Sequence, residues 1–177
     1  AGRVIEGKGQ LEAVEAINIL INYYKIKNIK LYIVGSREEN YTKLLKRKID
    51  EYNLIDNVIF TGYLNNVNEL RSRMEYELVC SKSEGFGRVV IEGMLSNNVM
   101  IVSNAGALPE IVTNGIDGFV YELGNYKQLA NIILNCYNGK YDLHTIKQNA
   151  KNKCINKFSQ RNNASEIVEI YQRLIIN

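Results

Sequence analysis

The chain has 177 residues, of which 46% are hydrophobic and 23% charged, and its net charge is +3. This composition fits one domain with an apolar core and excludes a disordered chain, and the small, dispersed charge gives no reason to expect nucleic acid as a partner. No apolar run approaches the roughly 20 residues that span a bilayer. The cysteines, Cys80, Cys136 and Cys154, are odd in number and lack C-x-x-C spacing, which favours a reducing, cytoplasmic setting.

Apolar runs alternate with amphipathic segments, an order typical of α/β folds with a mostly parallel sheet. The chain begins as if a strand were already under way, so we expect a fragment of a longer protein whose first strand ends near Val4. Further strands are expected at 29–34, 58–61, 77–80, 99–103 and 119–121. Helices are expected at 10–24, 38–52, 66–74, 87–96, 108–112, 126–138, 143–157 and 160–176. This order predicts a Rossmann-like, doubly wound parallel sheet.

In such a sheet, ligands bind at the carboxyl ends of the strands. The loops at these ends are expected at 6–9, 35–36, 62–64, 81–87 and 104–108, and all of them carry glycine or polar residues. We therefore expect one crevice that collects these loops.

The most informative stretch runs from Cys80 to Glu92 and reads as a strand, a glycine-containing turn and a helix. Backbone N–H groups in the turn and the positive end of the helix dipole would suit an anion such as a diphosphate. Glu84 and Glu92 lie in positions where they could bracket such a ligand, since a carboxylate can accept from both hydroxyls of a ribose. Alternatively, Glu84 is a helix cap and Glu92 a solvated helical residue.

Arg3 and Lys8 fall beside the loop after the first expected strand. They are either surface charges or phosphate ligands, because a guanidinium forms paired hydrogen bonds with phosphate oxygens and an ammonium acts as a point charge. His144, the only histidine, is remote from these loops, which argues against a zinc site or a Ser-His-Asp triad. The chain contains no Asp-x-Asp, so a metal site for a sugar nucleotide is not expected.

The run S-x-x-E-G-F-G-x-x-x-x-E at residues 81–92 resembles the C-terminal domain of retaining glycosyltransferases of family 4, which have the GT-B architecture. Other segments resemble that family in the same order. They are Gly2-Arg3 with Lys8-Gly9, the strand closed by Gly35, the segment 58–63, and the segment 103–119 that contains Pro109-Glu110-Ile111-Val112.

The resemblance implies a role for each matching residue. Arg3 and Lys8 would bind the donor diphosphate and stabilise the leaving group, and Glu84 would contact hydroxyls of the donor sugar. The remaining donor-binding positions would be Gly62, Tyr63 and Leu64 near the nucleobase, Gly85, Phe86, Gly87, Arg88 and Val89 around the sugar and phosphates, and Glu92 at the ribose. No metal and no other cofactor would be needed.

The resemblance also implies that residues 1–177 are the nucleotide-sugar-binding half of a two-domain enzyme whose N-terminal acceptor domain is absent here. The whole enzyme would transfer a sugar from a UDP- or GDP-sugar to a sugar or lipid-linked acceptor with retention of configuration, in polysaccharide or glycolipid synthesis at the inner membrane face. Peripheral association with that membrane would follow. Two alternatives stay open: a nucleotide-sugar-binding module without transfer activity, and a GT-B epimerase.

Two departures from the family pattern stand out. Gly93 follows Glu92 where the family usually has alanine, and Ala107 follows Gly106 where the family often has a second glycine. In a helix interior, glycine costs about 1 kcal/mol relative to alanine. The apolar stripe at 164–175 is expected to pack on the core and to be partly exposed without the other domain.

Overall fold

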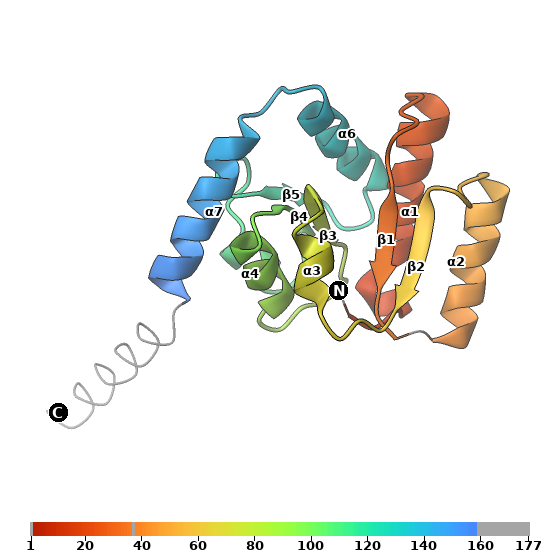
Figure 1. The fold of residues 1–177 in the computed structure, drawn as a ribbon, viewed down its shortest axis with the longest axis horizontal. Coiled ribbons are helices and arrows are strands. Elements are labelled where there is room, and N and C mark those ends of the chain that lie inside the picture. Colours follow the sequence, from red (N-terminus) through yellow and green to blue (C-terminus); the bar gives the residue numbers. More distant parts are fainter. Residues whose placement is uncertain (1, 37, 159–177) are drawn as a thin grey trace, which may run out of the picture.

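The computed structural model describes residues 2–36 and 38–158 (Figure 1). Its strands are β1 (Leu31–Val34), β2 (Val58–Gly62), β3 (Tyr76–Val79), β4 (Val99–Ser103) and β5 (Phe119–Tyr121). Its α-helices are α1 (Gln10–Asn18), α2 (Glu39–Glu51), α3 (Val67–Arg71), α4 (Arg88–Leu95), α5 (Leu108–Ile111), α6 (Tyr126–Tyr137) and α7 (Leu143–Lys157). A 3-10 turn, η1 (Glu6–Lys8), precedes α1, and a π-helical turn, η2 (Ile19–Tyr23), extends it.

Every pairing between the named strands is parallel, in the orders β1-β2 and β3-β4-β5. The Rossmann-like class is confirmed, although the described strands form two hydrogen-bonded groups rather than one continuous sheet. The expected first strand is present only as an extended segment beside the end of β1. There Gly2 N–H donates to the carbonyl of Val34 at 3.1 Å, and Val4 N–H donates to that of Ser36 at 2.7 Å.

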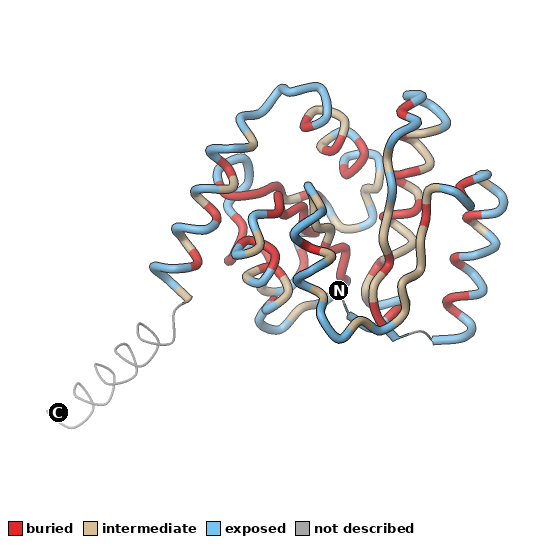
Figure 2. Tube along the Cα trace, in the orientation of Figure 1, coloured by how far each residue is buried: buried red, intermediate tan, exposed pale blue. Residues whose placement is uncertain are grey.

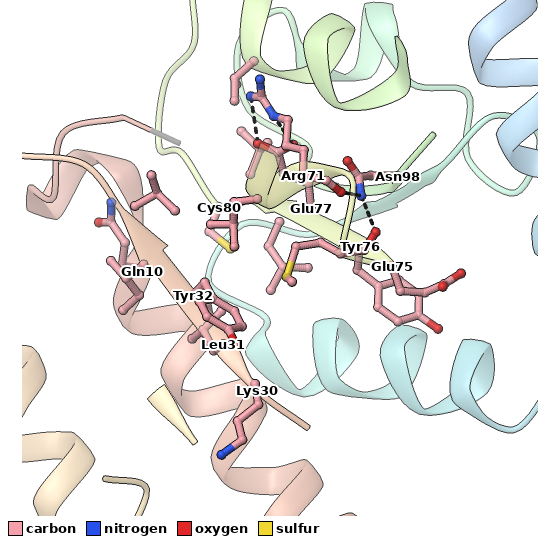
Figure 3. Close-up of a pocket in the computed structure, with 18 of the residues that line it drawn as sticks. Gln10, Lys30, Leu31, Tyr32, Arg71, Glu75, Tyr76, Glu77, Cys80 and Asn98 are labelled. Atoms are coloured by element: carbon pink, nitrogen blue, oxygen red, sulfur yellow. Dashed lines mark hydrogen bonds and ion pairs between the residues drawn. The ribbon is translucent and has the colours of Figure 1, made fainter. Parts of the chain in front are cut away.

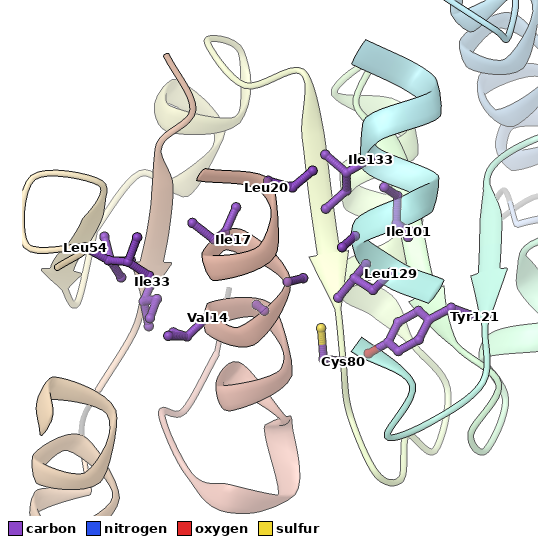
Figure 4. Packing of buried hydrophobic residues seen from close by; sticks show 14 of the residues in the cluster. Val14, Ile17, Leu20, Ile33, Leu54, Cys80, Ile101, Tyr121, Leu129 and Ile133 are labelled. Carbon is purple, nitrogen blue, oxygen red and sulfur yellow. The ribbon is translucent and has the colours of Figure 1, made fainter. Parts of the chain in front are cut away.

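The central strand β4 is buried along its whole length (Figure 2). Its side chains contribute to two hydrophobic clusters. Val99 and Ile101 pack in the cluster built around α1, α2 and α6, part of which is drawn in Figure 4. Met100 and Val102 belong to a second cluster with residues of α4, α5 and α7. Because successive strand residues point to opposite faces, this alternation means that helices cover both faces, as a doubly wound fold requires.

Apart from the first expected strand, the helices and strands of the described residues agree with the sequence expectations except at their ends. The helix expected at 10–24 changes to π geometry after Asn18, where Tyr24 N–H reaches back to the carbonyl of Ile19. The helix expected at 66–74 ends at Arg71, and Asn66 is its N-cap without a capping side-chain hydrogen bond. The helix expected at 160–176 and its apolar stripe lie outside the described residues.

Gly9 lets the turn after the N-terminal segment pack directly on the end of β3. Its φ is +66°, and a Cβ at this position would lie 1.9 Å from the carbonyl oxygen of Cys80. Cys80 itself is a buried core residue, as expected, and burial raises the pKa of its thiol to about 12. The left-handed φ and the contact with backbone both exclude a side chain here.

Gly9→Ala should therefore lower the free energy of unfolding by about 1–3 kcal/mol, the usual cost of a strained backbone conformation. Gly7→Ala is the matched control in the same turn, since a Cβ there meets nothing within 4 Å. Urea unfolding followed by circular dichroism measures both. Equal stability of the two variants would contradict the close packing at Gly9.

Candidate functional site

The turn η1 and the loop after β3 are tied together at the carboxyl edge of the strands. Lys82 N–H donates to the carbonyl of Gly7 at 2.9 Å, and Lys82 Nζ lies 2.6 Å from Glu6 Oε1. These contacts join residues that are about 75 positions apart in the chain. The two loops are therefore in contact, as expected if they share one crevice.

Two of the residues expected to do chemistry meet at this junction. Lys8 Nζ lies 2.6 Å from Glu84 Oε2, and the two side chains are only 33% and 17% exposed. Arg3 is exposed on the neighbouring segment, where its carbonyl accepts a hydrogen bond from the Gln10 side chain at 3.0 Å. Arg3, Lys8 and Glu84 all border the same cavity. The pair of a fixed ammonium and a carboxylate gives this edge adjacent sites for an anion and for hydroxyl donors.

The amino end of α4 closes the junction from another side. Gly87 caps the helix with φ of +72°, and a Cβ there would lie 2.7 Å from the δ-methyl group of Ile111. The first helical hydrogen bond runs from Val90 N–H to the carbonyl of Gly87, so the amides of Arg88 and Val89 precede it. Gly85 borders open space. These features fit the predicted anion seat.

The loop after β4 supports the turn that carries Glu84. Ala107 N–H donates to the carbonyl of Glu84 at 3.0 Å. A Cβ on Gly106 would lie 2.4 Å from the same carbonyl oxygen, and the φ of Gly106 is +56°. Gly106 is thus the glycine that this contact requires, whereas Ala107 contributes through its backbone, so the departure from the family pattern at Ala107 leaves the contact intact.

Glu92 lies half-exposed on α4, and its Oε2 is 2.9 Å from Nη1 of Arg71. Arg71 is buried and forms a second ion pair with Glu77, with Nε 2.9 Å from Oε2. Sequence reasoning missed Arg71. Glu77 could have indicated it, because this carboxylate lies inside the otherwise apolar strand Tyr76–Val79 and a buried charge requires a charged partner.

The residues expected near a nucleobase lie at the carboxyl end of β2 and in the loop that follows it. Gly62 ends β2, and its carbonyl accepts from Gly35 N–H at 2.9 Å. Tyr63 is 77% exposed, and Leu64 is half-buried. Phe86 is 57% exposed on the α4 side, with its ring centroid 6.4 Å from that of Phe158. Exposed aromatic rings of this kind offer stacking surfaces for a planar ligand.

A cavity of about 500 Å³ separates the facing edges of β1 and β3 (Figure 3). Strand residues such as Leu31, Tyr32 and Tyr76 form its walls, and Arg3, Lys8 and Glu84 border its end at the carboxyl edge. The side chains that could bind a diphosphate and a sugar therefore lie at this end of the cavity. The walls between the two strands offer apolar side chains.

Within residues 2–36 and 38–158, no cluster of three or more His, Cys, Asp and Glu side chains is arranged to hold a metal ion. The same residues include no helix that is both long and apolar enough to cross a bilayer.

The family model for glycosyl transferases group 1 matches residues 1–153. The capsular polysaccharide biosynthesis glycosyltransferase CapM of Staphylococcus aureus is 27% identical over 98% of this chain and 45% of its own length. A UDP-Gal:alpha-D-GlcNAc-diphosphoundecaprenol alpha-1,3-galactosyltransferase of Escherichia coli is 24% identical over 99% of this chain and 45% of its own length. The chain thus spans about half the length of these curated relatives.

Solved structures agree with this result. The Anabaena protein HepE in complex with UDP superposes with a TM-score of 0.88 at 26% identity, over 97% of this chain and 48% of that one. The C-terminal domain of the group 1 glycosyl transferase LpcC from Francisella tularensis superposes with a TM-score of 0.79 at 25% identity, over 90% of this chain and 84% of that one. On the match of the family model, this chain belongs to the family of glycosyl transferases group 1.

Proposed function

We propose that this chain is the donor-binding domain of a glycosyltransferase that moves a sugar from a nucleoside diphosphate sugar to an acceptor with retention of configuration. The observation that carries the proposal is the contact between Lys8 and Glu84 beside the amino end of α4. It joins a cation, a carboxylate and the first amides of α4 at one edge of the fold. Membership of the glycosyl transferase family makes a donor sugar the natural ligand for that combination.

The proposed catalysis is electrostatic. When the bond between sugar and diphosphate breaks, negative charge grows on the diphosphate and positive charge on the sugar ring. Lys8, Arg3 and the amino end of α4 would stabilise the leaving diphosphate, and Glu84 would accept from sugar hydroxyls and stabilise the ring. Groups fixed before the reaction are effective because they need no reorganisation when the charge develops.

The nucleoside would extend from the diphosphate toward two further positions. Glu92 would accept hydrogen bonds from the ribose, and Tyr63 with Leu64 would line the base. We favour a UDP-sugar over a GDP-sugar, because UDP is the nucleotide bound to HepE, the structural neighbour described above. A sugar or lipid-linked acceptor in polysaccharide or glycolipid synthesis is supported by the names of CapM and of the E. coli galactosyltransferase.

We infer that residues 1–177 are the C-terminal half of the enzyme and that a second domain supplies the acceptor site. The chain spans only about half of its curated relatives, and the LpcC structure, 84% of which it covers, is itself a C-terminal domain. The whole enzyme would act in the cytoplasm, associated peripherally with the inner face of the membrane.

Lys8→Ala should weaken UDP binding to the full-length protein by about 10–100-fold, the usual worth of a hydrogen bond to a charged group. Isothermal calorimetry with UDP and with GDP measures the effect and identifies the preferred base. Lys82→Ala is the control, because Lys82 is an exposed lysine of the same junction that pairs with Glu6. An unchanged UDP affinity in Lys8→Ala would remove Lys8 from the site.

Glu84→Gln should lower the turnover number for donor hydrolysis or transfer by at least about 100-fold, a typical loss when a charge that stabilises the transition state is removed. Affinity for UDP, which lacks the sugar, should change much less. The measurement is release of UDP from UDP-sugars by the full-length enzyme. Turnover equal to that of the wild type would exclude Glu84 from the mechanism.

Activity of the full-length enzyme should be unaffected by EDTA, because the proposal balances the diphosphate charge with Arg3, Lys8 and the helix amides. Initial rates with and without chelator test this, with restoration by Mg²⁺ or Mn²⁺ as the control. Loss of activity that added metal restores would show that a cation is required.

A further inference from the structure

We propose that Arg71 is a positioning residue for the ribose subsite: its guanidinium fixes the carboxylate of Glu92, and Glu77 in turn fixes the guanidinium. The inference rests on the proposed function, in which Glu92 accepts hydrogen bonds from the ribose.

The guanidinium of Arg71 contacts Glu77 through Nε and Nη2, and contacts Glu92 through Nη1. Nε and Nη2 of Arg71 donate to Oε2 and Oε1 of Glu77 at 2.9 and 3.1 Å, which is a paired, fork-like contact. Nη1 donates to Oε2 of Glu92 at 2.9 Å and to Oδ1 of Asn68 at 3.2 Å. The fork fixes the plane of the group, so the direction in which Nη1 holds Glu92 is fixed as well. Figure 3 displays the contact of Arg71 with Glu77 at the edge of the cavity.

Gly93 provides the space for this network. A Cβ at this position would lie 2.7 Å from Oε2 of Glu77 and 2.4 Å from Sδ of Met100. Glycine in a helix interior costs about 1 kcal/mol relative to alanine. The glycine that departs from the family pattern therefore makes room for the carboxylate that anchors Arg71, directly beside Glu92 in the chain.

The exposure of Arg71, Glu77 and Glu92 indicates that this network positions the Glu92 carboxylate rather than stabilises the fold. The side chains of Arg71 and Glu77 are 7% and 13% exposed, whereas that of Glu92 is 46% exposed. Buried ion pairs are often no more stable than apolar side chains of similar volume. This network ends in the half-exposed carboxylate of Glu92, so its effect is to hold that side chain in one orientation before a ligand arrives.

The same contact fixes two elements of the proposed nucleoside site relative to each other. Arg71 is the last residue of α3, which follows the segment with Tyr63 and Leu64, and Glu92 lies on α4. The Arg71–Glu92 contact therefore links the proposed base-binding segment to the proposed ribose-binding helix. Oε1 of Glu92 lies 3.9 Å from Nη2 of Arg88, a contact too long for a hydrogen bond, and remains able to accept from a ligand.

The test compares UDP with 2′-deoxy- and 3′-deoxy-UDP by calorimetry on the full-length protein. The wild type should prefer UDP by about tenfold, as expected for hydrogen bonds to a charged group. The double variant Arg71→Met/Glu77→Leu removes the buried pair without leaving either partner as an unpaired buried charge, and it should reduce that preference to less than about twofold. Arg71→Lys, which cannot form the fork, should give an intermediate preference. Thermal unfolding establishes that each variant is folded.

Arg73→Met is the matched control, because Arg73 is an exposed arginine just beyond α3 that pairs with Glu69, and it should keep the full preference. Glu92→Gln reports on the proposed function itself and should abolish the preference with Arg71 in place. If Glu92→Gln loses the preference and the folded Arg71 variants keep it, the positioning role is refuted while the ribose assignment stands. If Glu92→Gln keeps it, or the wild type does not bind UDP, the proposed donor site is refuted together with the inference.

Discussion

The close approach of Gly9 to the carbonyl of Cys80 is the constraint on which the candidate site depends. It allows the turn η1 to pack against the end of β3, and that packing brings Lys8 within 2.6 Å of Glu84. Both a left-handed φ and the absence of a side chain are required at this single position. A cation from the first loop and a carboxylate from a loop about 75 residues later then share one edge of the fold.

The candidate site depends on supporting contacts beneath the residues that would bind the donor. Beneath the Glu84 turn, Gly106 and Ala107 contact its backbone carbonyl. Beneath Glu92, the buried pair of Arg71 and Glu77 holds the carboxylate from the side of the core. Each support places a fixed charge or amide before a ligand arrives, which is the arrangement that electrostatic catalysis needs.

Much of this organisation follows from the sequence. Alternating apolar and amphipathic segments predicted the strands and helices, because a strand buried on both faces and a helix with one apolar face have different periods. The stretch from Cys80 to Glu92 located the strand, the turn and the helix of the site. The contact of Lys8 with Glu84 was predicted only as a shared crevice, since no local pattern gives the distance between loops that are far apart in the chain.

Other features were beyond sequence reasoning for identifiable reasons. The partner of Glu77 is Arg71, and propensity and periodicity report burial of a segment but not which buried charges pair. The steric reason for Gly93 could not be predicted either, because a helical pattern shows that glycine is unfavourable there but not that the Glu77 carboxylate lies beside it. The division of the described strands into two groups also escaped prediction, because it depends on where hydrogen-bonding edges meet in space.

The most direct test of the central claim is a crystal structure of the full-length protein with a UDP-sugar bound. The account predicts the diphosphate within hydrogen-bonding distance of Lys8 Nζ and the first amides of α4, with the donor sugar at Glu84 and the ribose at Glu92. A nucleotide bound elsewhere, with Lys8 and Glu84 still paired to each other and remote from the ligand, would contradict it.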